Sequence, residues 1–256
     1  IRGIIMQLLL TTLANAIIGF IVGACGVSGF LLPMFYTALT DFSVPEALVL
    51  SYWVFVISSP LGFVGCKDKM SREKKTLGWL CVGSAIGAVL GVKLNSFFSP
   101  KGVKIILYIV VLLAGIYIVI NESRKKASDE KRSPKLDSKP FMLAFGIITG
   151  AVCALGGSGG PILVMPLLAT MGMEVHTAMA VGLLDSLFVS VPAFVGYVRN
   201  VNLSDLTLYM VVVLLAYCIS MFIGRKLSSK VPSKPLKMVV GVFSVIIAVY
   251  MIITTI

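Results

Sequence analysis

Two glycine-rich segments, each with a serine and a following proline, hold the residue types that could bind an anion. The first is Gly26-Val27-Ser28-Gly29, closed by Pro33, and the second is Gly156-Gly157-Ser158-Gly159-Gly160, closed by Pro166. Clustered glycines weaken a helix and allow backbone conformations that other residues avoid. A helix that restarts after such a break presents unpaired backbone N–H groups and partial positive charge, which together can bind an anion without a cationic side chain.

Residues in and around both breaks are therefore candidates for substrate binding. The candidates within the breaks are Ser28, Gly29, Gly157, Ser158, Gly159 and Gly160. Cys25 and Cys153 flank the breaks and could contact a sulfur compound, although packing is the commoner role of such cysteines. Ser59 and Ser190 occupy corresponding positions in the two halves of the chain and could line a substrate path.

Asp185 is the one acid well inside an apolar segment. Ionisable residues within the membrane are functional candidates, so Asp185 could carry a proton for coupling. A carboxyl group capped by a neighbouring hydroxyl such as that of Ser186 is the alternative. The position corresponding to Asp185 in the first half is Val54, so its role is not duplicated.

The composition shows what kind of scaffold must position these residues. Hydrophobic residues make up 58% of the 256 residues and charged ones 13%, and the mean hydropathy is +1.01. These values predict an all-α polytopic membrane protein, because long apolar runs without alternation exclude a barrel. The net charge of +11 does not indicate nucleic-acid binding, since the basic residues gather in loops. None of the five cysteines forms a C-x-x-C pair, so neither a metal site nor another cofactor is expected.

Ten apolar segments are predicted along the chain, five in each half. They lie at about 4–25, 30–40, 46–66, 76–94, 104–120, 140–155, 161–171, 177–197, 206–227 and 236–256. We expect a first transmembrane repeat at 1–120, a mobile cytoplasmic connector at 121–139 and a second transmembrane repeat at 140–256. A small-residue stripe supports the repeat, since Gly83, Gly87 and Gly91 recur as Ala216, Ser220 and Gly224. Such stripes usually serve close helix packing.

Loop charges predict that the two repeats are inverted. The loop at 67–75 holds five basic residues, whereas its counterpart at 198–205 holds only Arg199. The next loop of the second half instead carries Arg225, Lys226, Lys230 and Lys234. This exchange predicts five crossings per half, with both termini outside. The segment after each break is only about a dozen residues long, so eight spans with two re-entrant segments is the alternative.

The order of motifs resembles that of the TauE/SafE sulfite exporter family. In each half a glycine-rich break with a following proline precedes an alanine-containing helix start, Pro45-Glu46-Ala47-Leu48 or His176-Thr177-Ala178-Met179, and then Gly65 or Gly196. The resemblance covers nearly the whole chain and is closer in the second half, so we expect unequal half-sites. It implies a secondary transporter of sulfite, sulfonates or related organosulfur or carboxylate anions.

The sequence therefore predicts a transporter of small anions, not an enzyme, in the cell membrane. The substrate would bind mid-membrane at the two breaks and move by alternating access, with H⁺ or Na⁺ as a possible coupling ion. A passive anion channel is the nearer alternative. An intramembrane serine protease using Ser158 and His176 is a remote one, because His176 opens a segment near the membrane edge whereas Ser158 should lie deep.

Overall fold

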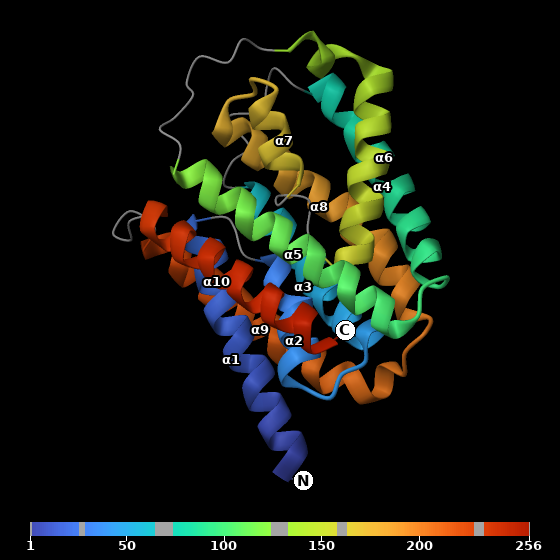
Figure 1. The fold of residues 1–256 in the computed structure, drawn as a ribbon, viewed down its shortest axis with the longest axis vertical. Helices are drawn as coiled ribbons and strands as arrows, with labels where there is room; N and C mark the ends of the chain where they lie inside the picture. The colour runs from blue at the N-terminus through green and yellow to red at the C-terminus, as the bar shows by residue number, and fades with distance from the viewer. Residues whose placement is uncertain are drawn as a thin grey trace.

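The computed structural model describes residues 2–25, 29–64, 74–123, 133–157, 163–227 and 233–255, which contain helices but no strand. The long helices are α1 (Arg2–Cys25), α3 (Val44–Val64), α4 (Lys74–Asn95), α5 (Pro100–Ser123), α6 (Lys139–Gly156), α8 (Val175–Val198), α9 (Leu203–Leu227) and α10 (Ser233–Thr255). The short ones are η1 (Gly29–Leu31), α2 (Leu32–Leu39), η3 (Pro134–Asp137) and α7 (Val164–Thr170). The all-α membrane fold is confirmed, and Figure 1 shows its arrangement.

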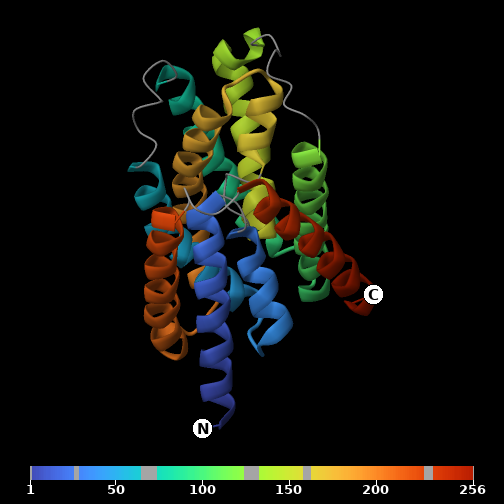
Figure 2. The same cartoon turned by 90° about the vertical axis from the view of Figure 1, so that its left-hand side faces the viewer.

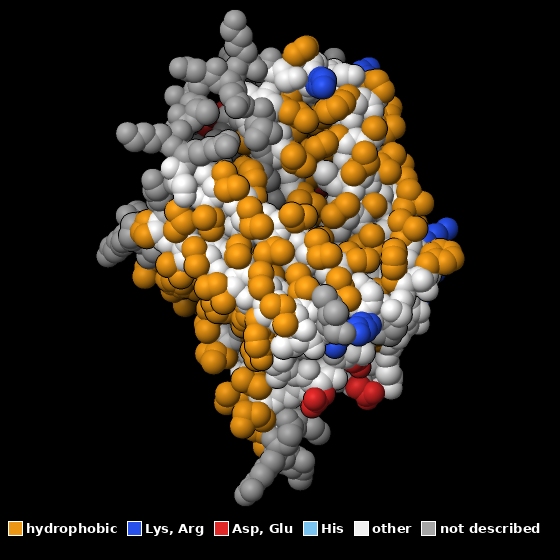
Figure 3. Space-filling view, viewed as in Figure 1, with side chains coloured by type: hydrophobic (Ala, Val, Ile, Leu, Met, Phe, Trp, Pro, Cys, Tyr) orange, Lys and Arg blue, Asp and Glu red, His pale blue; other side chains and the backbone are white. Residues whose placement is uncertain are grey.

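Eight helices within the described ranges are long and apolar enough to span a bilayer. The short helices α2 and α7 follow the two glycine-rich breaks, where the sequence predicted reduced length. Figure 3 shows hydrophobic side chains over most of one face, with few charged groups among them. Exposed leucines, isoleucines and valines are therefore the surface expected to meet lipid.

Local sequence explains where the central helices α3 and α8 begin. The backbone N–H of Ser43 donates to the Glu46 carboxylate at 2.7 Å, in the manner of a capping box. Glu174 precedes α8 and accepts a hydrogen bond from the backbone N–H of Thr177. The same carboxylate accepts from the Thr177 hydroxyl at 2.6 Å. Both acids therefore stabilise the starts of their helices.

The most extensive helix pairs each join one half of the chain to the other. They are α4 with α6, α1 with α9, α5 with α10, and α3 with α8. Matching α1–α5 in order with α6–α10 tests whether these pairs follow a repeat. Under this matching, α4 corresponds to α9 and α6 to α1, so the pair α4–α6 becomes the pair α9–α1. The pairs α5–α10 and α3–α8 each become themselves. Corresponding helices also run in opposite directions: in Figure 2, α1 rises from the N-terminus at the bottom, whereas α6 descends from the top.

Glycines let the helices of the pairs α4–α6 and α1–α9 approach to backbone contact. A Cβ atom at Gly87 of α4 would lie 2.2 Å from the carbonyl oxygen of Ile147 on α6. A Cβ at Gly23 of α1 would lie 2.1 Å from the carbonyl oxygen of Met221 on α9. The small-residue stripes therefore serve helix packing, as the sequence indicated.

Each short helix returns the chain to the end of the molecule where its repeat began. In the first half Phe42, just after α2, packs edge-on against Tyr209, with ring centroids 5.0 Å apart. The Tyr209 hydroxyl lies 3.3 Å from the side-chain oxygen of Gln7 near the start of α1. In the second half Met142 from the start of α6 shares a buried cluster with Met173, which follows α7. The third helix of each half consequently runs in the same direction as the first.

The described end of the connector is packed against the helices, so the prediction of a mobile connector is wrong for residues 133–138. Leu136 is fully buried among α6, α7 and α8 residues, because it supplies the apolar face of η3 to that cluster. The backbone N–H of Ser133 donates to the carbonyl of Met171 at 2.9 Å. The connector therefore anchors the start of α6 beside the end of α7.

Substitution of Gly87 by alanine tests the close helix packing. Because its Cβ would meet backbone, Gly87→Ala should lower the free energy of unfolding by about 1–3 kcal/mol. Gly78→Ala in the same helix is the matched control, since a Cβ there has nothing within 4 Å. The measurement is the thermal unfolding midpoint of both variants in detergent. Equal midpoints would contradict the packing role.

Candidate functional site

The second break begins where α6 ends at Gly157. The Gly157 backbone is left-handed, with φ 62° and ψ 20°, and its N–H donates to the carbonyl of Cys153. A Cβ atom at Gly157 would lie 2.5 Å from Cδ2 of Leu48 and 2.7 Å from Cγ of Pro33. Both the conformation and the space therefore require glycine.

The contact between Gly157 and Pro33 joins the two breaks. Pro33 lies in α2, which follows the first break, whereas Gly157 opens the second. Gly29 of the first break lies against Phe55 of α3, where a Cβ would be 3.0 Å from Cε1. Gly29 therefore allows the backbone to approach the Phe55 ring closely.

Two tyrosines hold the last turn of α6 in place. The hydroxyl of Tyr52 on α3 donates to the carbonyls of Cys153 at 2.7 Å and Ala154 at 3.1 Å. The hydroxyl of Tyr197 on α8 donates to the same Ala154 carbonyl at 2.9 Å. The two rings are stacked, with centroids 6.0 Å apart and planes 2° apart. The Ala154 carbonyl thus receives two side-chain donors, and the Cys153 carbonyl receives one in addition to the Gly157 N–H.

No side chain caps the start of either short helix. The N-cap position of α2 is Leu31 and that of α7 is Leu163, and neither makes a side-chain capping hydrogen bond. Ser28 and Ser158, together with Gly159 and Gly160, lie outside the described residues. The residue at the start of α2 that the structure places beside Gly157 is Pro33, through its side chain.

The other predicted substrate contacts are buried around α3 and α8. Cys153 is fully buried, whereas the side chain of Cys25 lies outside the described residues. Ser59 on α3 and Ser190 on α8 are both buried. They lie between two contacts of the antiparallel pair α3–α8, namely Gly62 with Leu183 and the Tyr52–Tyr197 stack. The Ser190 hydroxyl oxygen is buried and has no hydrogen-bond partner.

Asp185 is fully buried in the middle of α8, and it is the one buried Asp, Glu, Lys or Arg in the described ranges. Neither carboxylate oxygen has a hydrogen-bond partner. The hydroxyl that lies beside the carboxyl group is that of Ser84 on α4, although the two groups do not form a hydrogen bond of normal geometry. Across the described residues no group of three His, Cys, Asp or Glu side chains could hold a metal ion.

Several residues that shape this region were not recognised from the sequence. Tyr52 and Tyr197 resemble ordinary apolar-segment aromatics until their hydroxyl partners are seen. Pro60 and Pro192 lie inside the paired helices α3 and α8, where each removes a backbone hydrogen bond. These two prolines could have pointed to this region from the sequence, because proline within an apolar helix of a transporter marks irregular backbone. The side chain of His176 and the whole of Ser158 lie outside the described residues.

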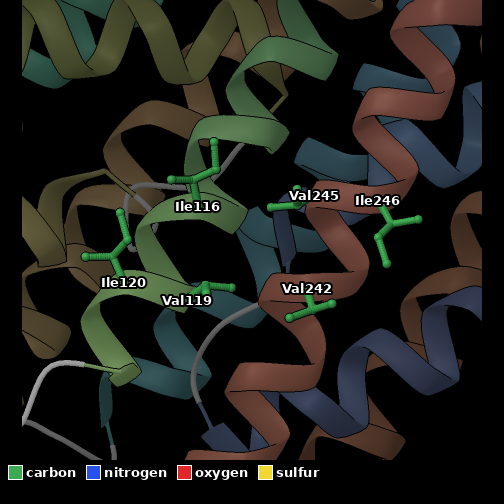
Figure 4. A pocket seen from close by; sticks show the side chains of 6 residues that line it. All are labelled: Ile116, Val119, Ile120, Val242, Val245 and Ile246. Atoms are coloured by element: carbon green, nitrogen blue, oxygen red, sulfur yellow. The ribbon is translucent and has the colours of Figure 1, made fainter.

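A separate groove between α5 and α10 does not suit an anion. Figure 4 shows its lining, which consists of Ile116, Val119, Ile120, Val242, Val245 and Ile246. Every lining side chain is aliphatic, so the groove offers no donor to a charged ligand. The polar groups near the middle of the molecule are those of the breaks and of α8.

Short helices follow the two breaks, and the end of α6 contacts α2 inside the protein. Together with an apolar surface that suits lipid, these features are typical of a polytopic membrane protein of the transporter class. A family model described as "Sulfite exporter TauE/SafE" matches residues 11–251. The chain belongs to the TauE/SafE family. It is also 25% identical over 255 residues, covering 92% of this chain and 93% of the relative, to "Probable membrane transporter protein MJ0441" of Methanocaldococcus jannaschii. No solved structure matches the chain.

Removal of the tyrosine hydroxyls tests how the end of α6 is held. Tyr52→Phe and Tyr197→Phe should each lower the free energy of unfolding by about 0.5–1.5 kcal/mol. The double variant should lose more than the sum, because only then does the Ala154 carbonyl lose both tyrosine donors. Tyr250→Phe on α10, where the side chain is 63% exposed, is the control. Additive losses in thermal unfolding would contradict a shared acceptor.

Proposed function

We propose that the chain is a secondary transporter of small anions, namely sulfite, sulfonates or related organosulfur anions. The observation that carries the proposal is the contact between Gly157 of the second break and Pro33 beside the first. This contact brings the left-handed backbone at the end of α6 against the short helix that follows the first break. Irregular backbone at such depth is tolerated where it is enclosed by protein or lines a polar path.

Neutral groups would bind the anion in this proposal. No Lys or Arg side chain is buried within the described ranges, so a fixed cation is not what would hold the substrate there. The start of α2 lies beside Gly157 through the Pro33 side chain, and buried hydroxyl-bearing residues lie on α3 and α8. An anion bound by such dipoles is also released more easily than one paired with a buried cation.

The substrate class comes from the family. The matching model carries the description of a sulfite exporter, and the archaeal relative is described as a probable membrane transporter. Both descriptions favour transport over catalysis. The remaining candidates within the breaks, Ser28, Ser158, Gly159 and Gly160, stay proposals for substrate contact.

Alternating access is favoured over a passive channel by the helix arrangement. Exchanging the two halves leaves the set of helix pairs unchanged, and α1 and its counterpart α6 run in opposite directions, as inverted repeats require (Figure 2). Inverted repeats with broken helices are typical of secondary transporters. The return of α2 and α7 to the starting end of each half supports five segments per half, with the connector at the end opposite the N-terminus.

Transport by the purified protein in liposomes tests the function. We expect saturable uptake of labelled sulfite, with competition by thiosulfate or sulfoacetate and weaker competition by a simple carboxylate. Accumulation above the external concentration, driven by a pH or sodium gradient, would exclude a passive channel. If none of these anions is transported or competes, the proposed substrate class is wrong.

Alanine at Gly157 should reduce sulfite transport at least tenfold, because it strains the backbone and pushes the breaks apart. Gly172→Ala is the matched control, since Gly172 also has a positive φ, 83°, but lies in the turn after α7. Initial uptake rates are compared at equal amounts of reconstituted protein. Equal loss in both variants would show that backbone strain alone, and not the meeting of the breaks, is responsible.

A further inference from the structure

Buried polar atoms that have no partner are concentrated on two neighbouring helices. Six such side-chain atoms occur in the described ranges, and five of them belong to α4 or α8. These five are Ser84 Oγ, Asn95 Nδ2, Asp185 Oδ1, Asp185 Oδ2 and Ser190 Oγ. Buried polar atoms are normally satisfied, so such a concentration requires an explanation.

The helices α4 and α8 are packed against one another, and Ser84, Asp185 and Asn95 lie along their contact. At one end Ser84 and Cys81 of α4 lie beside Asp185, although Ser84 and the carboxylate do not form a hydrogen bond of normal geometry. Further along, Gly196 of α8 lies against Val92 of α4. At the far end Asn95 lies beside the Tyr197 hydroxyl, again without a hydrogen bond of normal geometry. We call this contact between the two helices the α4–α8 seam.

The corresponding interface in the other half of the pseudo-symmetric arrangement is α3 with α9. There the position of Asp185 is taken by Val54, which is fully buried. The indole N–H of Trp53 donates to the Met210 carbonyl at 3.1 Å, so the polar group at this interface has a partner. The α3–α9 interface is thus packed with valine at the position that corresponds to Asp185, so helix packing at this position does not require an acid.

We propose that the α4–α8 seam is a hydrated proton path and that Asp185 binds the proton that is transported together with the anion. The inference rests on the proposed function and adds the coupling ion to it. Water is the usual partner of buried polar atoms, and chains of acids, hydroxyls and water carry protons in membrane transporters. A carboxyl group enclosed by protein with no cation beside it is stable when it carries a proton.

The surroundings of Asp185 contain no competing charge among the described side chains. The titratable group nearest to it is the neutral thiol of Cys81 on α4. On α3, which packs against α8, Glu46 is bonded to Ser43 and Tyr52 to the end of α6. No residue of α7 is titratable, and Lys93 of α4 lies near the end of its helix. On α6, Lys139 and Cys153 lie near opposite ends of the helix.

The position of Asp185 explains how anion and proton would be coupled. Ser84, beside Asp185, also packs against Gly150 of α6, where a Cβ would lie 2.3 Å from the Ser84 carbonyl oxygen. Gly157 follows seven residues later, which is about 10 Å along a helix. An anion near Gly157 and an ionised Asp185 would repel each other through the protein interior, where repulsion between charges is screened less than in water. Anion binding would therefore favour the protonated carboxyl group, and linkage makes the effect reciprocal.

Proton movement in liposomes containing the wild-type protein is the first test. An inward sulfite gradient with no pH gradient should acidify a lumen that contains a trapped pH-sensitive dye, in proportion to the anion taken up. A sodium gradient should not change the uptake. Sulfite uptake without lumen acidification, or uptake driven by sodium, would overturn the proton path and leave the proposed function standing. The absence of any anion movement would overturn both.

Substitution of Asp185 is the second test. Asp185→Asn should lower the pH-driven accumulation of sulfite at least tenfold while exchange of labelled for unlabelled sulfite stays measurable. Ser84→Ala should shift the pH at which uptake is half-maximal, a change that simple loss of packing would not produce. Asp205→Asn, an exposed acid in the first turn of α9, is the matched control. Accumulation by Asp185→Asn within twofold of wild type would overturn the assignment.

Discussion

Every backbone group of a helix that stops inside a bilayer must find a partner within the protein, and the centre of this structure depends on that constraint. The last turn of α6 ends at depth, and Tyr52 and Tyr197 donate to its carbonyls from the two helices that flank it. The stacked rings fix α3, α6 and α8 relative to one another. The position of Gly157, and with it the meeting of the two breaks, follows from those hydroxyl contacts.

The same helices combine close packing with unsatisfied polarity. Glycine contacts bring α4 within backbone distance of α6, so there is little room for adjustment along that face. The neighbouring face of α4, toward α8, instead holds polar atoms without partners. Helix α4 is thus tightly packed on the face toward α6 and polar on the face toward α8. Such an arrangement suits a protein in which one group of helices moves as a body while ions and substrate pass beside it.

The helices themselves could be predicted from the sequence, because apolar length and glycine or proline punctuation are local properties. The segment after Gly157 was correctly expected to be short. The tyrosine contacts could not be predicted, because the residues that they join lie far apart in the sequence, 101 and 102 positions for Tyr52 and 43 positions for Tyr197. The docking of Leu136 was missed because one apolar residue in a charged stretch carries no periodic signal.

The exchange of partners between the halves has a consequence for how the chain is made. The most extensive contacts of α1 and α4 are with α9 and α6, all supplied by the second half. During synthesis the first five helices therefore enter the membrane with their glycine faces toward lipid, and their packing waits for the chain that follows. The most extensive helix contacts of the bundle form only when both halves have been inserted.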